Sequence, residues 1–146
     1  MTVLHLISSL RRGGMERQLC NIIASNDPEQ INNHVVYFNE TATNYIEEYG
    51  LQDSVTLIDG EKKRWQRLVR IARRLQPDVI ISWGYKEAIW GALLSFRYGF
   101  SFVNGSIRHG VFKNNFSGYI RMALLHASKY VMANSLAGLK ANKLNR

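Results

Sequence analysis

The chain has 146 residues, of which 46% are hydrophobic and 21% charged, a composition typical of one soluble globular domain with its own core. No apolar run approaches the roughly 18 residues of a membrane span, and the single cysteine excludes an internal disulfide and a thiolate metal cluster. A net charge of +8 predicts attraction to phosphate in nucleic acid, anionic lipid or a phosphorylated ligand. Because the N-terminus lacks the basic and then apolar order of a signal peptide, we expect a cytoplasmic protein.

The first element is a strand over residues 2–7, where aliphatic residues with little alternation are typical of a strand covered on both faces. Loop 8–14 follows and ends in Gly13 and Gly14, at the start of a helix with apolar residues at helical spacing. Free backbone N–H groups at the positive end of a helix dipole, with no Cβ atoms in the way, form an anion site. The competing interpretation is a plain strand-to-helix turn capped by glycine.

Strand and helix patterns alternate along the rest of the chain. Strands are expected at residues 34–38, 55–58, 78–82, 102–103 and 129–133, and helices at residues 15–24, 42–49, 61–76, 86–98, 116–127 and 136–143. A polar loop is expected at residues 104–110, and Ser135 is placed to cap the last helix. This alternation predicts an α/β fold with a doubly wound parallel sheet, which binds ligands outside the carboxyl ends of its strands. The loops that matter are then 8–14, 83–86 and 105–110.

Two of the expected helices have unusual compositions. Helix 61–76 carries seven of the nineteen basic residues around an apolar face, so it has the composition to rest on an anionic bilayer. The alternative is a solvated outer face, because the apolar side must also cover the sheet. Helix 86–98 is apolar nearly all round, which predicts that it is well covered.

Several side chains with chemical potential are expected to be structural. Cys20 lies on the apolar face of the first helix and is predicted to be a buried, inert thiol, because nothing near it would lower its pKa. Trp65, Trp83 and Trp90 are expected to pack in the core, with Trp83 the best candidate for a sugar platform because it ends a strand at the functional edge. Glu16 is expected to serve the helix dipole.

Four stretches of the chain, in the right order, resemble retaining glycosyltransferases of family four, which have the GT-B fold. They are the strand that runs into GGMERQL (13–19), PDVIISWG (77–84), GSIR (105–108) and VMANS (131–135). Together they span almost the whole chain. The resemblance implies a Rossmann-like doubly wound sheet that is one of the two domains of a GT-B fold.

The resemblance further implies that residues 1–146 are a truncated N-terminal, acceptor-side domain, and that the C-terminal donor-binding domain is absent. The complete enzyme would transfer a sugar, with retention, from a nucleotide-sugar donor to a cell-envelope or lipid-linked saccharide. Its chemistry needs no metal and no protein base, because the leaving diphosphate accepts the proton of the acceptor. We therefore expect no cofactor, an inactive isolated fragment and a cytoplasmic protein, peripheral on the inner face of the membrane.

Site residues carry over from the resemblance by position. The backbone amides of Gly13 and Gly14 would contact the donor diphosphate, and Arg108 would lie close to the reacting sugar. The acceptor residues would be Tyr85, Lys86 and His109. Arg12 is assigned to the acceptor side as well, although Arg11 and Arg12 depart from the family's pattern, and a solvated side chain is the alternative. Arg108 stands where the better-described members have histidine, and an arginine stays protonated, so it would stabilise charge rather than act as a base.

Two other functions stay open at this stage. In a nucleotide-dependent oxidoreductase, Glu40 after the second strand would bind the ribose, but the first loop lacks the G-x-G-x-x-G pattern. A non-catalytic basic module that binds phosphate-containing ligands fits the charge of +8. No nucleic-acid-binding motif is present and the cations gather on one helix, so we expect no nucleic-acid partner.

Overall fold

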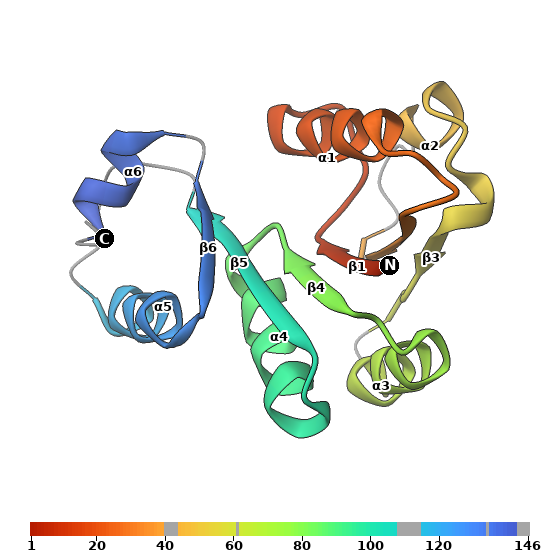
Figure 1. The fold of residues 1–146 in the computed structure, drawn as a ribbon. Coiled ribbons are helices and arrows are strands. Elements are labelled where there is room, and N and C mark those ends of the chain that lie inside the picture. Colours follow the sequence, from red (N-terminus) through yellow and green to blue (C-terminus); the bar gives the residue numbers. More distant parts are fainter. Residues whose placement is uncertain (40–43, 61, 108–114, 134, 143–146) are drawn as a thin grey trace.

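The computed structural model describes residues 1–39, 44–60, 62–107, 115–133 and 135–142 of the chain (Figure 1). Strands and helices alternate within these ranges. The strands are β1 (Thr2–Ile7), β2 (Asn32–Tyr37), β3 (Val55–Leu57), β4 (Val79–Ser82), β5 (Ser101–Ile107) and β6 (Tyr130–Ala133). The helices are α1 (Gly14–Ser25), α2 (Asn44–Glu48), α3 (Arg64–Leu75), α4 (Tyr85–Tyr98), α5 (Phe116–Ala127) and α6 (Leu136–Ala141), and a short 3-10 turn, η1, spans Gln52–Ser54.

The strands form one sheet in the order β3-β2-β1-β4-β5-β6, and every neighbouring pair is parallel. The chain first builds outward from β1 to β3, and then crosses back to place β4 on the other side of β1. This reversal puts a topological switch point between β1 and β4, where ligands bind in doubly wound sheets. The predicted Rossmann-like parallel sheet is confirmed.

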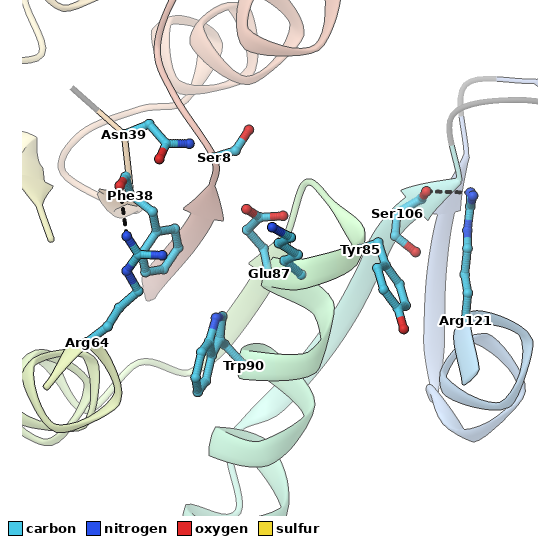
Figure 2. A pocket seen from close by; sticks show the side chains of 10 residues that line it. Ser8, Phe38, Asn39, Arg64, Tyr85, Glu87, Trp90, Ser106 and Arg121 are labelled. Atoms are coloured by element: carbon cyan, nitrogen blue, oxygen red, sulfur yellow. Dashed lines mark hydrogen bonds between the residues drawn. The ribbon is translucent and has the colours of Figure 1, made fainter. Parts of the chain in front are cut away.

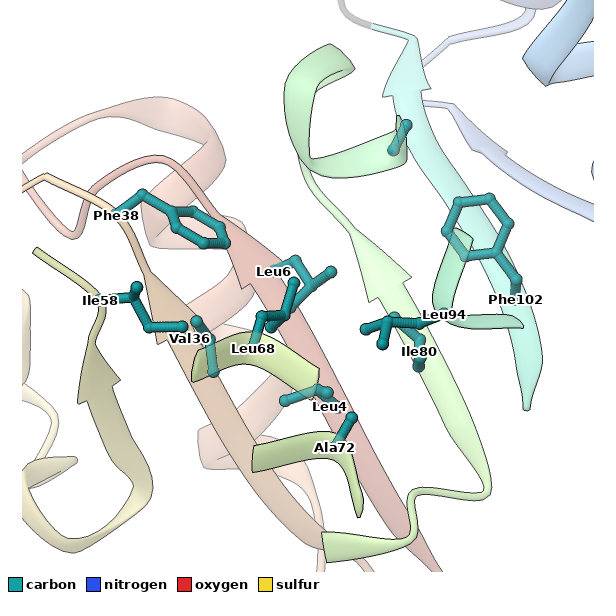
Figure 3. Packing of buried hydrophobic residues seen from close by; sticks show 11 residues of the cluster. Leu4, Leu6, Val36, Phe38, Ile58, Leu68, Ala72, Ile80, Leu94 and Phe102 are labelled. Atoms are coloured by element: carbon teal, nitrogen blue, oxygen red, sulfur yellow. The ribbon is translucent and has the colours of Figure 1, made fainter. Parts of the chain in front are cut away.

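Alternation along each strand sends side chains to two separate cores. In β1, Leu4 and Leu6 face α3 and α4, whereas His5 and Ile7 face α1 and α2. Figure 3 shows the core under α3 and α4, which contains Leu4, Leu6, Val36, Phe38, Ile58, Leu68, Ala72, Ile80, Ala88, Leu94 and Phe102. Because both faces are covered, β1 carries mostly apolar side chains on both sides, as its sequence predicts.

The expected loop at 104–110 is wrong for its first half, because residues 104–107 continue β5. Asn104 is fully buried, donates from Nδ2 to Ser128 Oγ (3.2 Å) and accepts at Oδ1 from the backbone N–H of Ser106 (3.1 Å). Gly105 allows close approach to β4, since a Cβ there would lie 2.5 Å from the backbone oxygen of Ser82. Asn104 is thus compatible with this buried strand because Ser128 and the Ser106 N–H satisfy its amide, and Gly105 fits because it has no Cβ.

Two helix predictions also need correction. The basic helix begins at Arg64 rather than residue 61, because Lys63 takes a left-handed conformation (φ 61°) and precedes the first turn together with Lys62. Helix α4 covers the sheet with only one side, so the side chains of Phe96 (93% exposed) and Leu93 (46% exposed) face solvent. Among the described helices, none is both long enough and apolar enough to cross a membrane.

Candidate functional site

A cavity of about 450 Å³ opens at the carboxyl edge of the sheet, at the switch point between β1 and β4 (Figure 2). Its lining comes from the residues that follow β1, β2 and β4, from the end of β5, and from helices α3, α4 and α5. These residues are Ser8, Phe38, Asn39, Arg64, Tyr85, Lys86, Glu87, Trp90, Ser106 and Arg121. The cavity volume lies within the range of about 300–1,000 Å³ that is usual for ligand sites.

Arg64 forms one wall of the cavity and is held in place by the loops around it. Its Nε donates to the carbonyl of Gly60 (3.2 Å) and its Nη2 to that of Phe38 (3.4 Å), and the guanidinium lies over the Phe38 ring at 5.5 Å. The Nη1 group has no partner among the described residues. An arginine fixed in this way can present its remaining donors to an anion with little loss of side-chain entropy.

Arg121 lies on the opposite side of the cavity from Arg64 in Figure 2. Its Nη2 donates to the carbonyl of Ser106 at 2.7 Å, which ties α5 to the end of β5. The hydroxyl Oγ of Ser106 is buried in the cavity wall and has no hydrogen-bond partner within the described ranges.

The first turn of α4 supplies the floor of the cavity. Gly84 caps this turn in an extended conformation, and Tyr85, Lys86 and Glu87 follow it. Glu87 is 5% exposed, so a carboxylate lies buried at the positive end of the helix, where the dipole favours it. Two predicted acceptor residues, Tyr85 and Lys86, therefore line the cavity.

The Gly13-Gly14 turn lies between the end of β1 and α1. Gly13 is extended (φ −162°, ψ 164°) and its carbonyl accepts the first bond of the helix, from Arg17 N at 3.0 Å. The backbone N–H groups of Gly13 and Gly14 have no hydrogen-bond partner in the part of the chain that the structure describes. A Cβ on Gly14 would meet nothing within 4 Å, whereas a Cβ on Gly13 would meet the buried carboxylate of Glu16, so there is open space beside Gly14 but not beside Gly13.

Arg12 does not line the cavity. The guanidinium of Arg12 faces Glu48 at 3.6 Å, with both side chains largely in solvent. Arg108, His109 and Glu40 lie outside the described residues.

Trp83 is a core residue, as the packing interpretation predicts. Its side chain is 2% exposed, and its Nε1 donates to Nδ1 of the buried His5 at 3.2 Å. Because Nδ1 accepts, the proton of the neutral ring is on Nε2, which donates to Asn33 Oδ1 at 3.1 Å. Burial lowers the pKa of His5 to about 4, which keeps the ring neutral.

Sequence reasoning did not single out Arg64, Glu87, Ser106 or Arg121 as site residues. Two features of the sequence could have indicated the two arginines. Arg64 opens a helix, where a cation opposes the dipole, and Arg121 is the lone arginine in an otherwise mostly apolar helix. A cation at a helix start or in an apolar helix is disfavoured there by the helix itself, which indicates that a contact outside the helix stabilises it.

The 3-2-1-4-5-6 parallel sheet, with a cavity at its switch point, defines a Rossmann-like α/β domain. No protein-family model matches the sequence, and no curated protein does. Solved structures do. Anabaena HepE, crystallised with UDP, with UDP-glucose, and with UDP and glucose, is 19–21% identical with TM-scores of 0.75–0.79 over 98% of this chain. The lipopolysaccharide outer core galactosyltransferase WaaB is 14% identical, with a TM-score of 0.74 over 97% of this chain.

A weaker similarity exists to the dTDP-glucose 4,6-dehydratase of Bacillus anthracis in complex with NAD, which is 16% identical with a TM-score of 0.55 over 91% of this chain and 53% of that chain. At these identities the likeness establishes the fold alone, which is a Rossmann-like α/β domain. The chain spans 40% of the length of HepE and 41% of WaaB.

Proposed function

We propose that this chain is the N-terminal, acceptor-side domain of a retaining GT-B glycosyltransferase of family four. The complete enzyme transfers a sugar from a nucleotide-sugar donor to a cell-envelope or lipid-linked saccharide. The observation that carries the proposal is the cavity at the carboxyl edge, in a fold that superposes on HepE and WaaB. The UDP-glucose bound to HepE supports a nucleotide-sugar donor, and the name of WaaB supports an envelope saccharide as acceptor.

In this proposal a second domain grips the donor and the Gly13-Gly14 turn contacts its diphosphate from across the cleft. The amides of this turn, at the positive end of α1, stabilise the negative charge that develops on the leaving phosphate. Arg108 acts in the same way near the reacting sugar. The leaving diphosphate takes the acceptor's proton, so no metal and no protein base is needed.

The acceptor binds in the cavity in this scheme. Tyr85 and Lys86 contact it directly, and His109 and Arg12 complete the acceptor side. The main contribution of this domain is then to hold the acceptor hydroxyl in line with the donor sugar.

The test uses the complete enzyme and two substitutions at Gly14. Gly14→Pro removes the amide hydrogen but suits the first position of a helix, and the extended Gly13 before it is compatible with proline. Gly14→Ala keeps the N–H and meets no neighbour. We expect Gly14→Pro to lower kcat about ten- to a hundredfold with nucleotide-sugar donor, because one charge-assisted hydrogen bond is lost, and Gly14→Ala to stay within about threefold.

Circular dichroism and urea unfolding of both variants check that the fold is kept. Equal activity of Gly14→Pro and Gly14→Ala would contradict the diphosphate contact. Absence of sugar transfer from every nucleotide sugar by the wild-type enzyme would overturn the glycosyltransferase proposal. The 146-residue chain alone should transfer nothing, because the donor site is on the other domain.

A peripheral position on the inner face of the cytoplasmic membrane is a second part of the proposal. Arg70, Arg73 and Arg74 of α3 are exposed and form no ion pair with the described residues, whereas Arg67 is tied to the carbonyl of Asp59 (2.9 Å). Co-sedimentation with vesicles tests it. Binding to anionic but not neutral vesicles, lost in a variant with all three arginines changed to glutamine, supports it, and equal binding to neutral vesicles contradicts it.

A further inference from the structure

A second cavity adjoins the one at the carboxyl edge. It has a volume of about 440 Å³ and is lined by Lys63, Arg64, Trp65, Gln66 and Trp90. Arg64 and Trp90 belong to both cavities, so the two hollows lie on either side of the same two side chains. We call the two adjoining hollows together the α3–α4 groove.

An aromatic pair forms part of this groove. The rings of Trp65 and Trp90 are stacked, with centroids 5.5 Å apart and an interplanar angle of 21°. Both side chains are half-buried, so they pack against the core and still reach the groove. Stacking fixes their orientation, and a fixed aromatic face matches the apolar C–H face of a pyranose ring.

The charged side chains of the groove are mostly cationic. Among the described residues that line it, Lys63, Arg64, Lys86 and Arg121 are basic and only Glu87 is acidic. Arg64 forms no ion pair with the described carboxylates, and its guanidinium is already oriented by two carbonyls and the Phe38 ring. A planar, pre-oriented guanidinium in a groove is suited to a carboxylate or a phosphate group.

We propose that the α3–α4 groove binds an acceptor that is an anionic oligosaccharide, with one sugar at the switch point, the next against the Trp65–Trp90 pair, and a carboxylate or phosphate group on Arg64. This inference rests on the proposed function and adds the acceptor class to it. Two adjoining subsites require a chain longer than one sugar. The cationic lining requires that the chain carry negative charge.

Binding of defined saccharides to the 146-residue chain tests the proposal by calorimetry. The probes are hexagalacturonate, which carries carboxylates, pentamannose 6-phosphate, which carries a phosphate, neutral maltohexaose, and monomeric galacturonate. We expect at least one anionic oligosaccharide to bind about tenfold or more tightly than maltohexaose, as one charge-assisted contact provides. The tighter of the two anionic probes identifies the acidic group. Hexagalacturonate should also bind about tenfold more tightly than its monomer.

Tryptophan indole N–H signals in nitrogen-15 NMR spectra report the location of the bound probe. The chain has three tryptophans, so each signal can be assigned by substitution. The signals of Trp65 and Trp90 should shift during titration. That of Trp83 should not, because its indole N–H is buried and bonded to His5.

Matched variants separate a specific site from general attraction to a basic chain. Arg64→Gln and Lys86→Gln should each lower affinity for the anionic probe about five- to tenfold, and Lys86 is exposed, so its loss leaves the fold unaffected. Arg97→Gln removes the same charge from the far end of α4, outside both cavities, and should leave affinity unchanged.

Three results would overturn the proposal: equal affinity for anionic and neutral oligosaccharides, equal affinity for hexamer and monomer, or an equal loss in Arg97→Gln and Arg64→Gln. None of them bears on sugar transfer by the complete enzyme, which the Gly14 variants test separately. Failure of the groove proposal is therefore distinguishable from failure of the proposed function.

Discussion

The two faces of the sheet differ in whether their polar and aromatic side chains are enclosed or line a cavity. Under α1 and α2, His5 and Trp83 are buried and bonded to each other, and Cys20 is fully enclosed. Under α3 and α4, the core opens at the carboxyl edge into cavities lined by Arg64 and Trp90. We call the face under α1 and α2 the sealed face and the face under α3 and α4 the open face. A tryptophan on the sealed face thus stabilises the fold, whereas one on the open face is available to a ligand.

Residue type alone does not mark the candidate site. Histidine, cysteine and tryptophan are the side chains that most often suggest chemistry, yet His5, Cys20 and Trp83 are enclosed on the sealed face. The cavity is lined instead by residues from six separate segments that meet at the switch point. Placement relative to the sheet, rather than chemical type, decides the role.

The largest expected effect comes from exchanging the two tryptophans for alanine. Trp83→Ala should lower the free energy of unfolding by about 3–5 kcal/mol, because it leaves a cavity and an unpartnered His5 Nδ1. Trp90→Ala should cost about 1–2 kcal/mol, because the half-buried ring leaves a smaller cavity. Urea unfolding of both variants measures the difference.

Trp83→Phe provides a milder version of the same test. It keeps most of the ring but removes the indole N–H, so the expected loss is about 1–3 kcal/mol. Should Trp90→Ala prove the more destabilising of the two alanine variants, the distinction between a sealed and an open face would be incorrect.

Acid should destabilise the sealed face through His5. Its pKa is about 4 in the folded protein and near 6.5 in the unfolded chain, so below pH 6.5 the unfolded state binds more protons. Stability that is fully present above pH 6.5 is therefore lost as the pH falls toward 4, by an amount on the order of 3 kcal/mol. Burial and Arg74 lower the pKa of His34 as well, which adds to the loss in the same direction.

Unfolding free energies of the wild type and His5→Gln between pH 7 and pH 4 check this expectation. The substitution removes the titrating group, so the variant should lose less stability over this range than the wild type does. An identical pH dependence of the two proteins would show that His5 is not the source.

Cys20 should be chemically silent on the same face. Burial, followed by the nearby carboxylates of Glu48 and Glu16, raises the pKa of the thiol to about 11 from 9.0. The thiolate population is then about a hundredfold lower than that of an unperturbed thiol, and the enclosing side chains block reagents. We expect negligible reaction with a disulfide reagent in native buffer and full reaction in urea. Rapid native reaction would mean that α1 opens readily.

The smallest effect is expected at Arg12, outside both cores. Its pair with Glu48 is 3.6 Å long and both side chains are largely solvated. Arg12→Ala should change the free energy of unfolding by no more than about 0.5 kcal/mol. In the complete enzyme Arg12→Ala also tests the predicted contact of Arg12 with the acceptor. A KM for the acceptor equal to that of the wild type would contradict this contact.

Much of the fold could be predicted from the sequence because local patterns reflect it directly. The apolar run of residues 2–7, the period of α1 and the cap at Ser135, which accepts from Gly138 N at 3.1 Å, agree with the structure. Residues 104–107 could not be assigned, because their polarity is compatible with a strand only when Ser128 and β6 stand beside them.

For the candidate site, the sequence identified the edge of the sheet but only part of the lining. Tyr85 and Lys86 were predicted from the loop after β4, and both line the cavity. Arg64 and Arg121 lie on helices, where a cation is ordinarily interpreted as solvated. Only the packing of α3 and α5 brings them to opposite walls of one cavity.

The sequence by itself determined the alternation of strands and helices, and hence the parallel sheet with a carboxyl edge, where the cavity lies. The physical reason is that hydrophobic period and turn residues act over short distances along the chain. Only the tertiary structure decided which face is sealed and which side chains share the α3–α4 groove. Those outcomes depend on contacts between segments such as Phe38, Arg64 and Trp90, whose proximity no local pattern encodes.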